Sequence, residues 1–249
     1  MVAAGPAADV ASASFYALDP DAILDAVEAL GLRPSGHLLA LASYENRVYQ
    51  IGLEDAPPVV AKFYRPGRWD DAAILEEHDY TLELAAAELP VVAPIQDAQG
   101  RTLHRHAAYR YALYPRVGGR APDLDDLAQL EELGRLVGRL HAIGALRPYR
   151  HRPAIDPVRL GEEPVRYLTQ GELVPADVRA AYAAVAGALV ERVRDTWAAV
   201  APHARLRLHG DCHGGNLLAR EGVIRLVDFD DSGNGPAMQD LWLFLSGDR

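Results

Sequence analysis

Lysine and cysteine are both nearly absent from this 249-residue chain: Cys212 is the only cysteine, and Lys62 is the only lysine among 25 basic residues. A single cysteine excludes an internal disulfide and is typical of proteins in a reducing compartment, so we expect a cytoplasmic protein. Lysine and arginine differ in shape, hydration and the way they meet phosphate oxygens. Lys62 is therefore the first candidate for a functional cation.

Basic surfaces and long hydrophobic runs are also missing. The formal net charge of -10 and a pI near 5.3 argue against a nucleic-acid partner held by a basic surface. The longest apolar run, residues 180–190, lies between Arg179 and Glu191 and is too short to cross a bilayer. The first 16 residues have no basic segment and contain Asp9, which is unlike a secretory signal. We expect a monomer that acts without nucleic acid or membrane.

The pattern of apolar residues predicts an α+β fold of two lobes. Three short β-branched and aromatic runs in residues 37–65 predict a small antiparallel sheet, with Lys62 in the third run. An amphipathic pattern that begins with acidic residues, within residues 68–89, predicts a helix. The composition of residues 90–95, 101–106 and 108–117 is typical of strands. We expect residues 1–117 to form a β-rich first lobe.

The second predicted lobe, residues 118–249, is mainly helical. Leucines at three- and four-residue intervals predict a helix that starts at Pro122 and Asp123 and ends at Gly144. A connector rich in proline and arginine follows at residues 147–164, and an alanine-rich helix is predicted for residues 175–200. Near the carboxyl end, the runs "LRLH", "NLLA" and "VIRLVDF" predict short strands around a polar loop.

That polar loop, "LHGDCHGGNLLAREGVIRLVDFDD" at residues 208–231, carries the chemistry. Asn216 follows Asp211 by five positions, and Asp228 ends the last apolar run. Phosphoryl transfer needs a carboxylate that orients a hydroxyl, and oxygen ligands that hold Mg²⁺ against the phosphates. The spacing matches the catalytic loop and the later metal-binding aspartate of kinases. The sequence therefore predicts an ATP- and Mg²⁺-dependent phosphotransferase.

A kinase site also needs a lysine on a strand, held by a glutamate of the following helix. Lys62 meets the first condition, and both Glu76 and Glu77 meet the second. Glu77 stands seven residues before Leu84 on the same predicted helical face, which favours it. Glu76 remains open.

Two other interpretations of the polar loop, a structural role in turns and a zinc site, use some of the same residues. Asp211, Asn216 and Asp228 could simply satisfy the backbone of turns, as Asp and Asn often do. A zinc site would use Asp211 with His209, Cys212 and His213. Adjacent residues of an extended segment point to opposite faces and only one cysteine is present, so a closed tetrahedral site is awkward.

Six further residues near these motifs have structural interpretations. We expect Cys212 to be a small packed side chain. His141 is expected to anchor a neighbouring loop through hydrogen bonds, and Asp240 to anchor the catalytic loop as a buried carboxylate. Trp242 and Phe244 are expected in the core, together with the leucine between them.

Four motifs in order, "SYENRVYQI", "KFYRPGRWD", "ILEEH" and "GDCHGGN", give the chain a family resemblance over residues 15–249. The chain resembles the bacterial stress response kinase A family, within the aminoglycoside and choline phosphotransferase superfamily of protein-kinase-like folds. The resemblance implies an ATP-dependent serine/threonine protein kinase. The wider superfamily implies a small-molecule hydroxyl acceptor instead, and a nucleotide-binding regulator without catalysis is a third reading.

The resemblance also implies roles for single residues. It makes Asp211 the proton acceptor, Asn216 and Asp228 the magnesium ligands, and Lys62 and Ser43 residues of the ATP site. Ser43 opens "SYENR", which stands where protein kinases carry a glycine-rich loop, although no G-x-G-x-x-G occurs there. The "DFD" motif lacks the glycine of its protein-kinase counterpart. The family continues through a further helical segment after the point where this chain ends, so we expect the second lobe to be incomplete.

Overall fold

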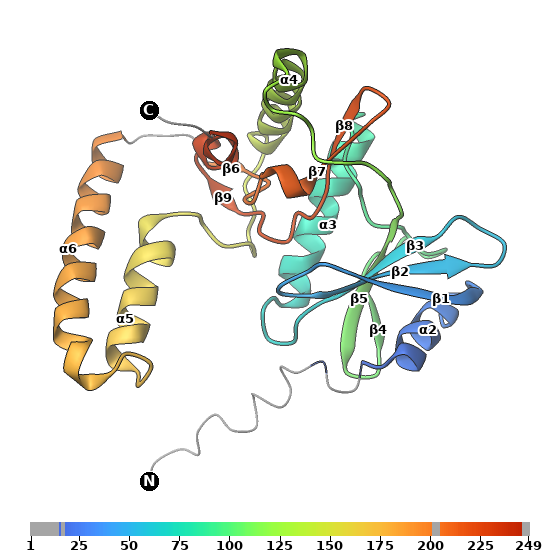
Figure 1. The fold of residues 1–249 in the computed structure, drawn as a ribbon, viewed down its shortest axis with the longest axis horizontal. Coiled ribbons are helices and arrows are strands. Elements are labelled where there is room, and N and C mark those ends of the chain that lie inside the picture. Colours follow the sequence, from blue (N-terminus) through green and yellow to red (C-terminus); the bar gives the residue numbers. More distant parts are fainter. Residues whose placement is uncertain (1–14, 16–17, 201–204, 246–249) are drawn as a thin grey trace, which may run out of the picture. The chain divides into compact units, whose positions relative to one another are not determined.

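The computed structural model describes residues 15, 18–200 and 205–245 (Figure 1). These residues pack into two compact units, which we describe one at a time: Met1–Asp123 with Gly215–Asp230, and Leu124–Gly214 with Asp231–Arg249. Helices and sheets are both present, so the predicted α+β class is confirmed. The lobe boundary after residue 117 stays a prediction. Most of the amino-terminal stretch that was judged unlike a secretory signal lies outside the described residues.

A five-stranded antiparallel sheet forms the centre of the first unit. Its order is β1 (Pro34–Leu41), β2 (Arg47–Leu53), β3 (Val59–Phe63), β5 (Tyr109–Pro115) and β4 (His104–His106). The predicted sheet in residues 37–65 is confirmed. The strand predicted for residues 90–95 is wrong, because Pro90 and Pro94 have no N–H to donate to a neighbouring strand. There the chain makes only an isolated bridge, between Val91 and Leu226.

Two helices cover opposite faces of this sheet, because neighbouring residues of a strand point in opposite directions. Phe63 and Tyr111 belong to the core cluster that includes α2 (Pro20–Glu28). Tyr64 and Ala112 instead pack with Ile74 of α3 (Asp71–Ala86). Lys62 alternates with Phe63 along β3 and therefore lies on the α3 face.

The starts of both helices follow capping rules. The Asp70 side chain accepts a hydrogen bond from Ala73 N at 2.8 Å, which confirms the predicted helix. Helix α2 was not predicted, although its start carries two recognisable signals. Asp19 accepts from Ala22 N at 2.9 Å, and Pro20 occupies the first helical position.

A β-hairpin from the end of the chain completes the first unit. Strands β7 (Leu217–Arg220) and β8 (Val223–Leu226) confirm the strands predicted from the runs "NLLA" and "VIRLVDF", and they pair antiparallel. Glu221 and Gly222 between them have φ of 54° and 75°, the left-handed geometry of a tight two-residue hairpin turn. The hairpin carries the chain from Asn216 back to Asp228 in a short distance.

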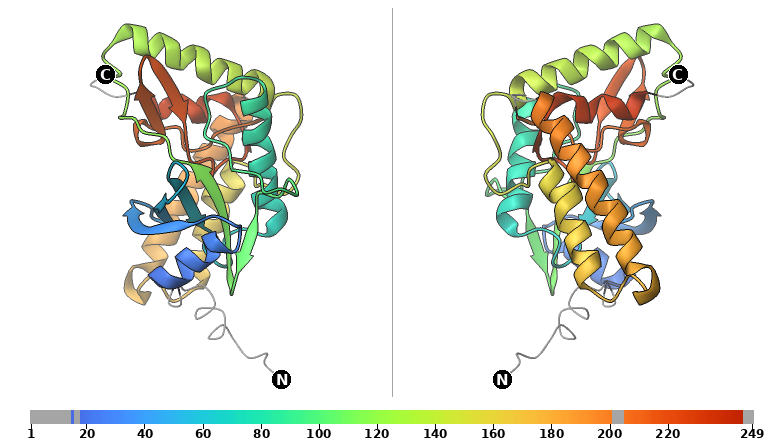
Figure 2. Two further views of the ribbon diagram at one scale, coloured as in Figure 1. Left: turned by 90° about the vertical axis from the view of Figure 1, so that its right-hand side faces the viewer. Right: turned by 90° about the vertical axis from the view of Figure 1, so that its left-hand side faces the viewer.

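The second unit contains the long helices α4 (Leu127–Gly144) and α6 (Ala176–Val200). The predicted start of α4 at Pro122 and Asp123 is wrong: Asp126 is the N-cap, and its side chain accepts from Ala128 N at 2.9 Å. The helix predicted for residues 175–200 is confirmed. The predicted connector holds a π-helical turn (Val158–Glu162), and its last two residues begin helix α5 (Glu163–Gln170), which was not predicted and runs antiparallel beside α6 (Figure 2).

Short elements complete the second unit. Strand β6 (Leu206–Arg207) pairs with β9 (Asn234–Gly235), and two 3-10 helices follow at Ala237–Asp240 and Trp242–Phe244. The core placement of Trp242 is wrong, because this short helix leaves the indole side chain 51% exposed. No helix within the described residues is long and apolar enough to cross a membrane.

Candidate active site

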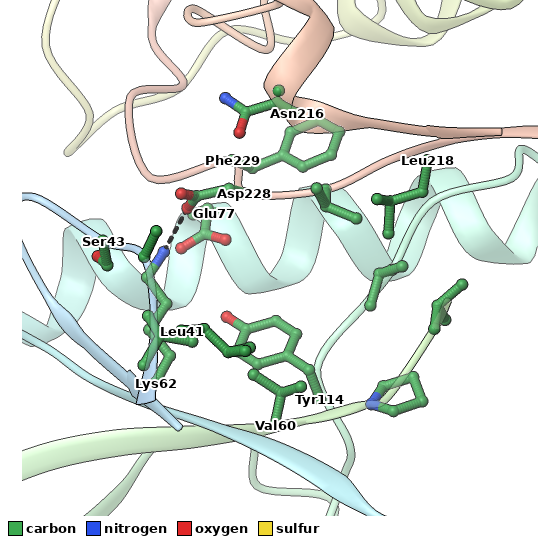
Figure 3. Close-up of a pocket in the computed structure, with 17 residues that line it drawn as sticks. Leu41, Ser43, Val60, Lys62, Glu77, Tyr114, Asn216, Leu218, Asp228 and Phe229 are labelled. Atoms are coloured by element: carbon green, nitrogen blue, oxygen red, sulfur yellow. Dashed lines mark hydrogen bonds and ion pairs between the residues drawn. The ribbon is translucent and has the colours of Figure 1, made fainter. Parts of the chain in front are cut away.

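A pocket of the first unit surrounds Lys62 and has a volume of about 300 Å³, at the small end of the range for ligand sites (Figure 3). Strands β1–β3 and β5, helix α3 and the β7–β8 segment all contribute to it. Its lining is Leu41, Ala42, Ser43, Val48, Val60, Lys62, Glu77, Val92, Tyr114, Pro115, Val117, Gly215, Asn216, Leu218, Val227, Asp228 and Phe229. Apolar walls with a few convergent polar groups are typical of a small-molecule site.

Lys62 is buried, with only 7% of its side chain exposed, and two carboxylates hold its ammonium group. Its Nζ lies 2.8 Å from Asp228 Oδ1 and 3.2 Å from Asp230 Oδ1. The same nitrogen stands 5.4 Å from the centre of the Tyr64 ring. A buried cation needs such partners, because desolvation without them would be costly.

These neighbours keep the Lys62 side chain charged. Burial alone lowers its pKa, but the carboxylates of Asp228, Asp230 and Glu77 outweigh burial and raise the pKa well above its usual value. A permanently protonated amine is suited to binding phosphate oxygens and not to acting as a base.

Only one of the two candidate glutamates faces this pocket. Glu77 is 2% exposed, lines the pocket, and is one of the carboxylates that raise the pKa of Lys62. Glu76 is more exposed and does not line it. The side chain of Glu77 thus lies at the pocket, and Figure 3 shows it beside Lys62 and Asp228, whereas the ion pairs of Lys62 are with Asp228 and Asp230.

Asn216 and Asp228 are brought together by the hairpin. The carbonyl of Asn216 accepts a hydrogen bond from Val227 N at 3.0 Å, which joins the two ends of the β7–β8 segment. Both side chains line the pocket. Asp228 has a φ of 59°, a left-handed conformation that is uncommon for residues other than glycine and that often marks a functional site.

The donor chemistry of this pair fits a divalent cation. A carboxylate and an amide both offer the hard oxygen ligands that Mg²⁺ prefers. Such a site would leave positions for water and phosphate oxygens, because Mg²⁺ is often held by one or two protein ligands. Lys62 next to the pair would place a fixed positive charge beside the same phosphates.

Ser43 follows strand β1 and also lines the pocket. Its loop is held in place by side chains and not by a glycine-rich turn. The buried Asn46 side chain accepts from Arg65 N at 3.1 Å, and Glu45 Oε2 lies 2.7 Å from Arg65 Nη1. These contacts tie the loop to the segment after β3, so side chains fix the position of this loop without a G-x-G-x-x-G motif.

Sequence reasoning missed three residues in and around the pocket: Arg68, Tyr114 and Asp230. Asp230 is 3% exposed and pairs with Lys62, and its Oδ2 lies 2.8 Å from Arg68 Nη1. The acidic third position of "DFD" was the available signal, and it was noted only as the absence of a glycine. Nothing in the spacing indicates that Arg68 meets it.

Tyr114 closes one side of the pocket and belongs to a buried hydrogen-bond cluster. Its hydroxyl lies 3.0 Å from the Tyr64 hydroxyl, which in turn lies 2.6 Å from His78 Nε2. His78 Nδ1 lies 2.8 Å from Thr102 Oγ1. Burial raises the pKa of Tyr114, so its phenol stays protonated near neutral pH.

The predicted catalytic loop of the second unit is anchored as the sequence suggested. Asp240 is fully buried and accepts hydrogen bonds from His209 N at 3.0 Å and Gly210 N at 2.8 Å. His141 Nε2 lies 3.0 Å from the same carboxylate. The predicted anchoring roles of His141 and Asp240 are confirmed. The proposed proton acceptor, Asp211, comes directly after this anchored segment.

The backbone conformation and close packing at position 210 explain why this loop needs a glycine there. Its φ is 89°, and a Cβ at this position would lie 2.1 Å from the carbonyl oxygen of Asp231. Asp211, the next residue, is partly exposed, and its carboxylate lies 3.4 Å from His213 Nε2. The loop therefore presents an accessible carboxylate on a backbone that permits little variation.

The four side chains of the alternative zinc-site hypothesis lie in different surroundings. Cys212 is completely buried, which confirms its expected packing role, and burial raises the pKa of its thiol. His209 is also buried, whereas Asp211 and His213 are partly exposed. Among the residues that the structure describes, no group of three or more His, Cys, Asp and Glu side chains is arranged to hold a metal.

Comparison with known proteins agrees with these features. The model of the phosphotransferase enzyme family matches residues 37–249. Stress response kinase A of Salmonella choleraesuis is 44% identical over 236 residues, which cover 95% of this chain and 71% of that protein. The kinase of the same name from Escherichia coli K12 is 43% identical over the same shares.

Solved structures show the same fold. An amicoumacin kinase in complex with AMP-PNP, Ca²⁺ and Ami matches with a TM-score of 0.73 at 21% identity, over 96% of this chain and 70% of that one. A spectinomycin phosphotransferase with ADP and spectinomycin matches with a TM-score of 0.62 at 16% identity, over 90% and 72%. At these identities the likeness concerns the fold alone. On the family match and the 44% identity, this chain belongs to the phosphotransferase enzyme family and, within it, to the stress response kinase A proteins.

Proposed function

We propose that this protein transfers the γ-phosphoryl group of ATP to a hydroxyl group in a Mg²⁺-dependent reaction. The observation that carries the proposal is the convergence of Lys62, Glu77, Asn216 and Asp228 on one pocket. These are the cation, the helix glutamate and the oxygen ligands that phosphoryl transfer requires. Bound Mg²⁺ would neutralise charge on the phosphates during transfer.

Each residue has a role that its surroundings support. Lys62, kept protonated by its carboxylate neighbours, would contact the α- and β-phosphates, and Glu77 would help to hold it. Asn216 and Asp228 would hold the metal. Ser43 would contact the nucleotide from the loop after β1. Residues 1–117 would thus form the ATP-binding lobe.

Asp211 would orient the acceptor hydroxyl and accept its proton. Its partly exposed carboxylate suits this role, because an acceptor must be able to approach it. The anchoring of His209 and Gly210 on Asp240 would fix the backbone in front of Asp211 and so reduce the loss of orientation entropy during reaction. Residues 118–249 would form the catalytic lobe.

We propose a serine or threonine hydroxyl of a protein as the acceptor. Support comes from the relatives named stress response kinase A, and from a Salmonella typhimurium relative, 44% identical, named serine/threonine protein kinase RdoA. A small-molecule hydroxyl is the second candidate, because the structures with the same fold include kinases of amicoumacin and spectinomycin. A nucleotide-binding regulator without catalysis is disfavoured, since every catalytic residue type is retained.

Transfer of labelled γ-phosphate from Mg²⁺-ATP tests the acceptor class. The purified protein is offered a general protein acceptor, an aminoglycoside and choline in parallel, with the Asp211→Asn variant as control. Label on protein serine or threonine that disappears in the variant supports the protein kinase. Label on a small molecule alone moves the acceptor to the second candidate, and nucleotide binding without any labelled product supports the regulator.

A further inference from the structure

Asp230 forms a buried bridge between the two cations beside the pocket. One oxygen, Oδ1, lies 3.2 Å from Lys62 Nζ, and the other, Oδ2, lies 2.8 Å from Arg68 Nη1. Only 5% of the Asp230 side chain is exposed, compared with 50% of Asp228, the other carboxylate that contacts Lys62. A buried carboxylate between two cations is held strongly, because removing it would leave both charges undercompensated.

The two carboxylates differ in what else they face. Asp228 lines the pocket, whereas Asp230 does not. In the proposed function, Asp228 shares its negative charge with the metal, so its attraction for Lys62 weakens when Mg²⁺-ATP binds. Asp230 keeps its charge for Lys62 and Arg68 at that stage, because it does not line the pocket.

Arg68 extends this bridge to two further elements. It stands two residues before Asp70, the N-cap of helix α3, which carries Glu77. Its Nη1 also lies 3.7 Å from Glu45 Oε2, in the loop that contains Ser43. The bridge therefore joins the "DFD" segment both to the start of α3 and to the loop after β1.

We propose that Asp230 is a further positioning residue of the nucleotide site, which holds Lys62 toward the phosphates and fixes it to Arg68 while Asp228 is engaged with the metal. This inference rests on the proposed function and deepens it. Asp230 acts through Lys62 and Arg68 and touches neither the metal nor the acceptor. The role is distinct from that of Asp228, although the two residues are separated by one position.

Steady-state kinetics of the full chain separate these roles. Asp230→Asn keeps the size of the side chain but removes its charge, so the KM for ATP should rise about tenfold, while kcat and the Mg²⁺ concentration for half-maximal rate at saturating ATP change little. Asp230→Glu restores the charge and should recover most of the affinity. Asp97→Asn is the matched control, since Asp97 is bonded to Arg101 and does not line the pocket.

Arg68→Gln provides a second arm that does not depend on the folding of Asp230→Asn. It leaves the contact between Lys62 and Asp230 in place, so a smaller rise in KM is expected, of about threefold. In the double variant, Arg68→Gln should add less than it does alone, because the two residues act through one bridge. Thermal unfolding of each variant shows whether enough protein is folded.

The possible outcomes test the positioning role of Asp230 separately from the proposed function. If the wild type neither binds nor turns over Mg²⁺-ATP, the proposed function fails. If the wild type is active and both Asp230→Asn and Arg68→Gln keep its KM, the positioning role is wrong. A raised Mg²⁺ requirement in Asp230→Asn, like that expected for Asp228→Asn, would also overturn it, because Asp230 would then be a metal ligand. A fall in kcat alone that follows the loss of folded protein would mean a purely structural carboxylate.

Discussion

Lys62 Nζ lies 2.8 Å from Asp228 Oδ1, although 166 positions separate the two residues in the chain. The only lysine of the protein thus meets the aspartate whose spacing from Asn216 predicts a metal ligand. A metal held by Asp228 and phosphates held by Lys62 would be immediate neighbours. This contact joins the residue proposed to bind the phosphates to the residue proposed to bind the metal.

The two adjacent glutamates of α3 should behave differently. Glu77→Gln removes a buried carboxylate that supports the charge of Lys62, so the KM for ATP should rise about fivefold to tenfold. Glu76→Gln changes a residue outside the pocket and should leave the KM within about twofold of the wild type. Initial rates as a function of ATP concentration measure both. Equal effects of the two substitutions would remove the assignment of Glu77.

Lys62 should make stability depend on pH only at the alkaline end. Its folded-state pKa lies above the value of 10.5 expected for the unfolded chain, so its stabilising contribution is complete below about pH 10.5 and is lost as the pH rises through the folded-state pKa. The difference in unfolding free energy between wild type and Lys62→Met should therefore be constant from about pH 7 to pH 10 and shrink above that range. A difference that instead grows in favour of the wild type as the pH rises from about 7 to 10 would show that burial dominates and that the folded-state pKa of Lys62 is lowered.

Asp240 should be essential to the anchored loop. Its carboxylate accepts two backbone N–H groups and lies 3.0 Å from His141 Nε2, so Asp240→Ala should lower the unfolding free energy by about 2 to 4 kcal/mol. Urea denaturation at neutral pH measures this loss. Gln239→Ala is a useful control, because it removes only one bond, from Gln239 Nε2 to the carbonyl of Gly210. An equal, small effect of both substitutions would mean that Asp240 is not the anchor.

Two glycines of the second unit should respond to alanine with opposite signs. Gly210→Ala would bring a Cβ against the carbonyl of Asp231 in a left-handed backbone, and we expect a loss of about 2 kcal/mol or more. Gly134 lies inside α4 with open space around it, so Gly134→Ala should gain about 0.5 to 1 kcal/mol. Thermal unfolding of the pair tests both signs. A tolerated alanine at position 210 would contradict the described loop geometry.

Much of the candidate pocket could be predicted from the sequence because its signals are local. The spacing of Asn216 and Asp228, and the position of Lys62 in a strand, follow from the order of residues along the chain. The bridge through Asp230 could not be predicted in the same way, since it depends on how the "DFD" segment packs against Arg68. Tertiary packing decides which buried charges meet.

The errors in the fold predicted from the sequence also have physical causes. Three acids precede helix α4, and the sequence alone does not show that Asp126 is the one whose side chain caps it. Helix α5 was missed because its surroundings are rich in proline and arginine, although Pro164 occupies a position near the helix start that proline tolerates. Trp242 was assigned to the core together with its apolar neighbours, whereas the structure leaves it half exposed.

The most direct test of the central claim compares Asp228→Asn and Asp211→Asn in two assays, Mg²⁺-dependent binding of ATP by calorimetry and transfer of labelled γ-phosphate to the acceptor found active with the wild type. The account predicts that Asp228→Asn lowers both Mg²⁺-dependent binding and transfer, the latter by about 10²-fold or more, and that Asp211→Asn lowers transfer as strongly but keeps ATP affinity close to that of the wild type. Unchanged transfer in both variants would contradict the assignment of this pocket and loop as a phosphotransferase site.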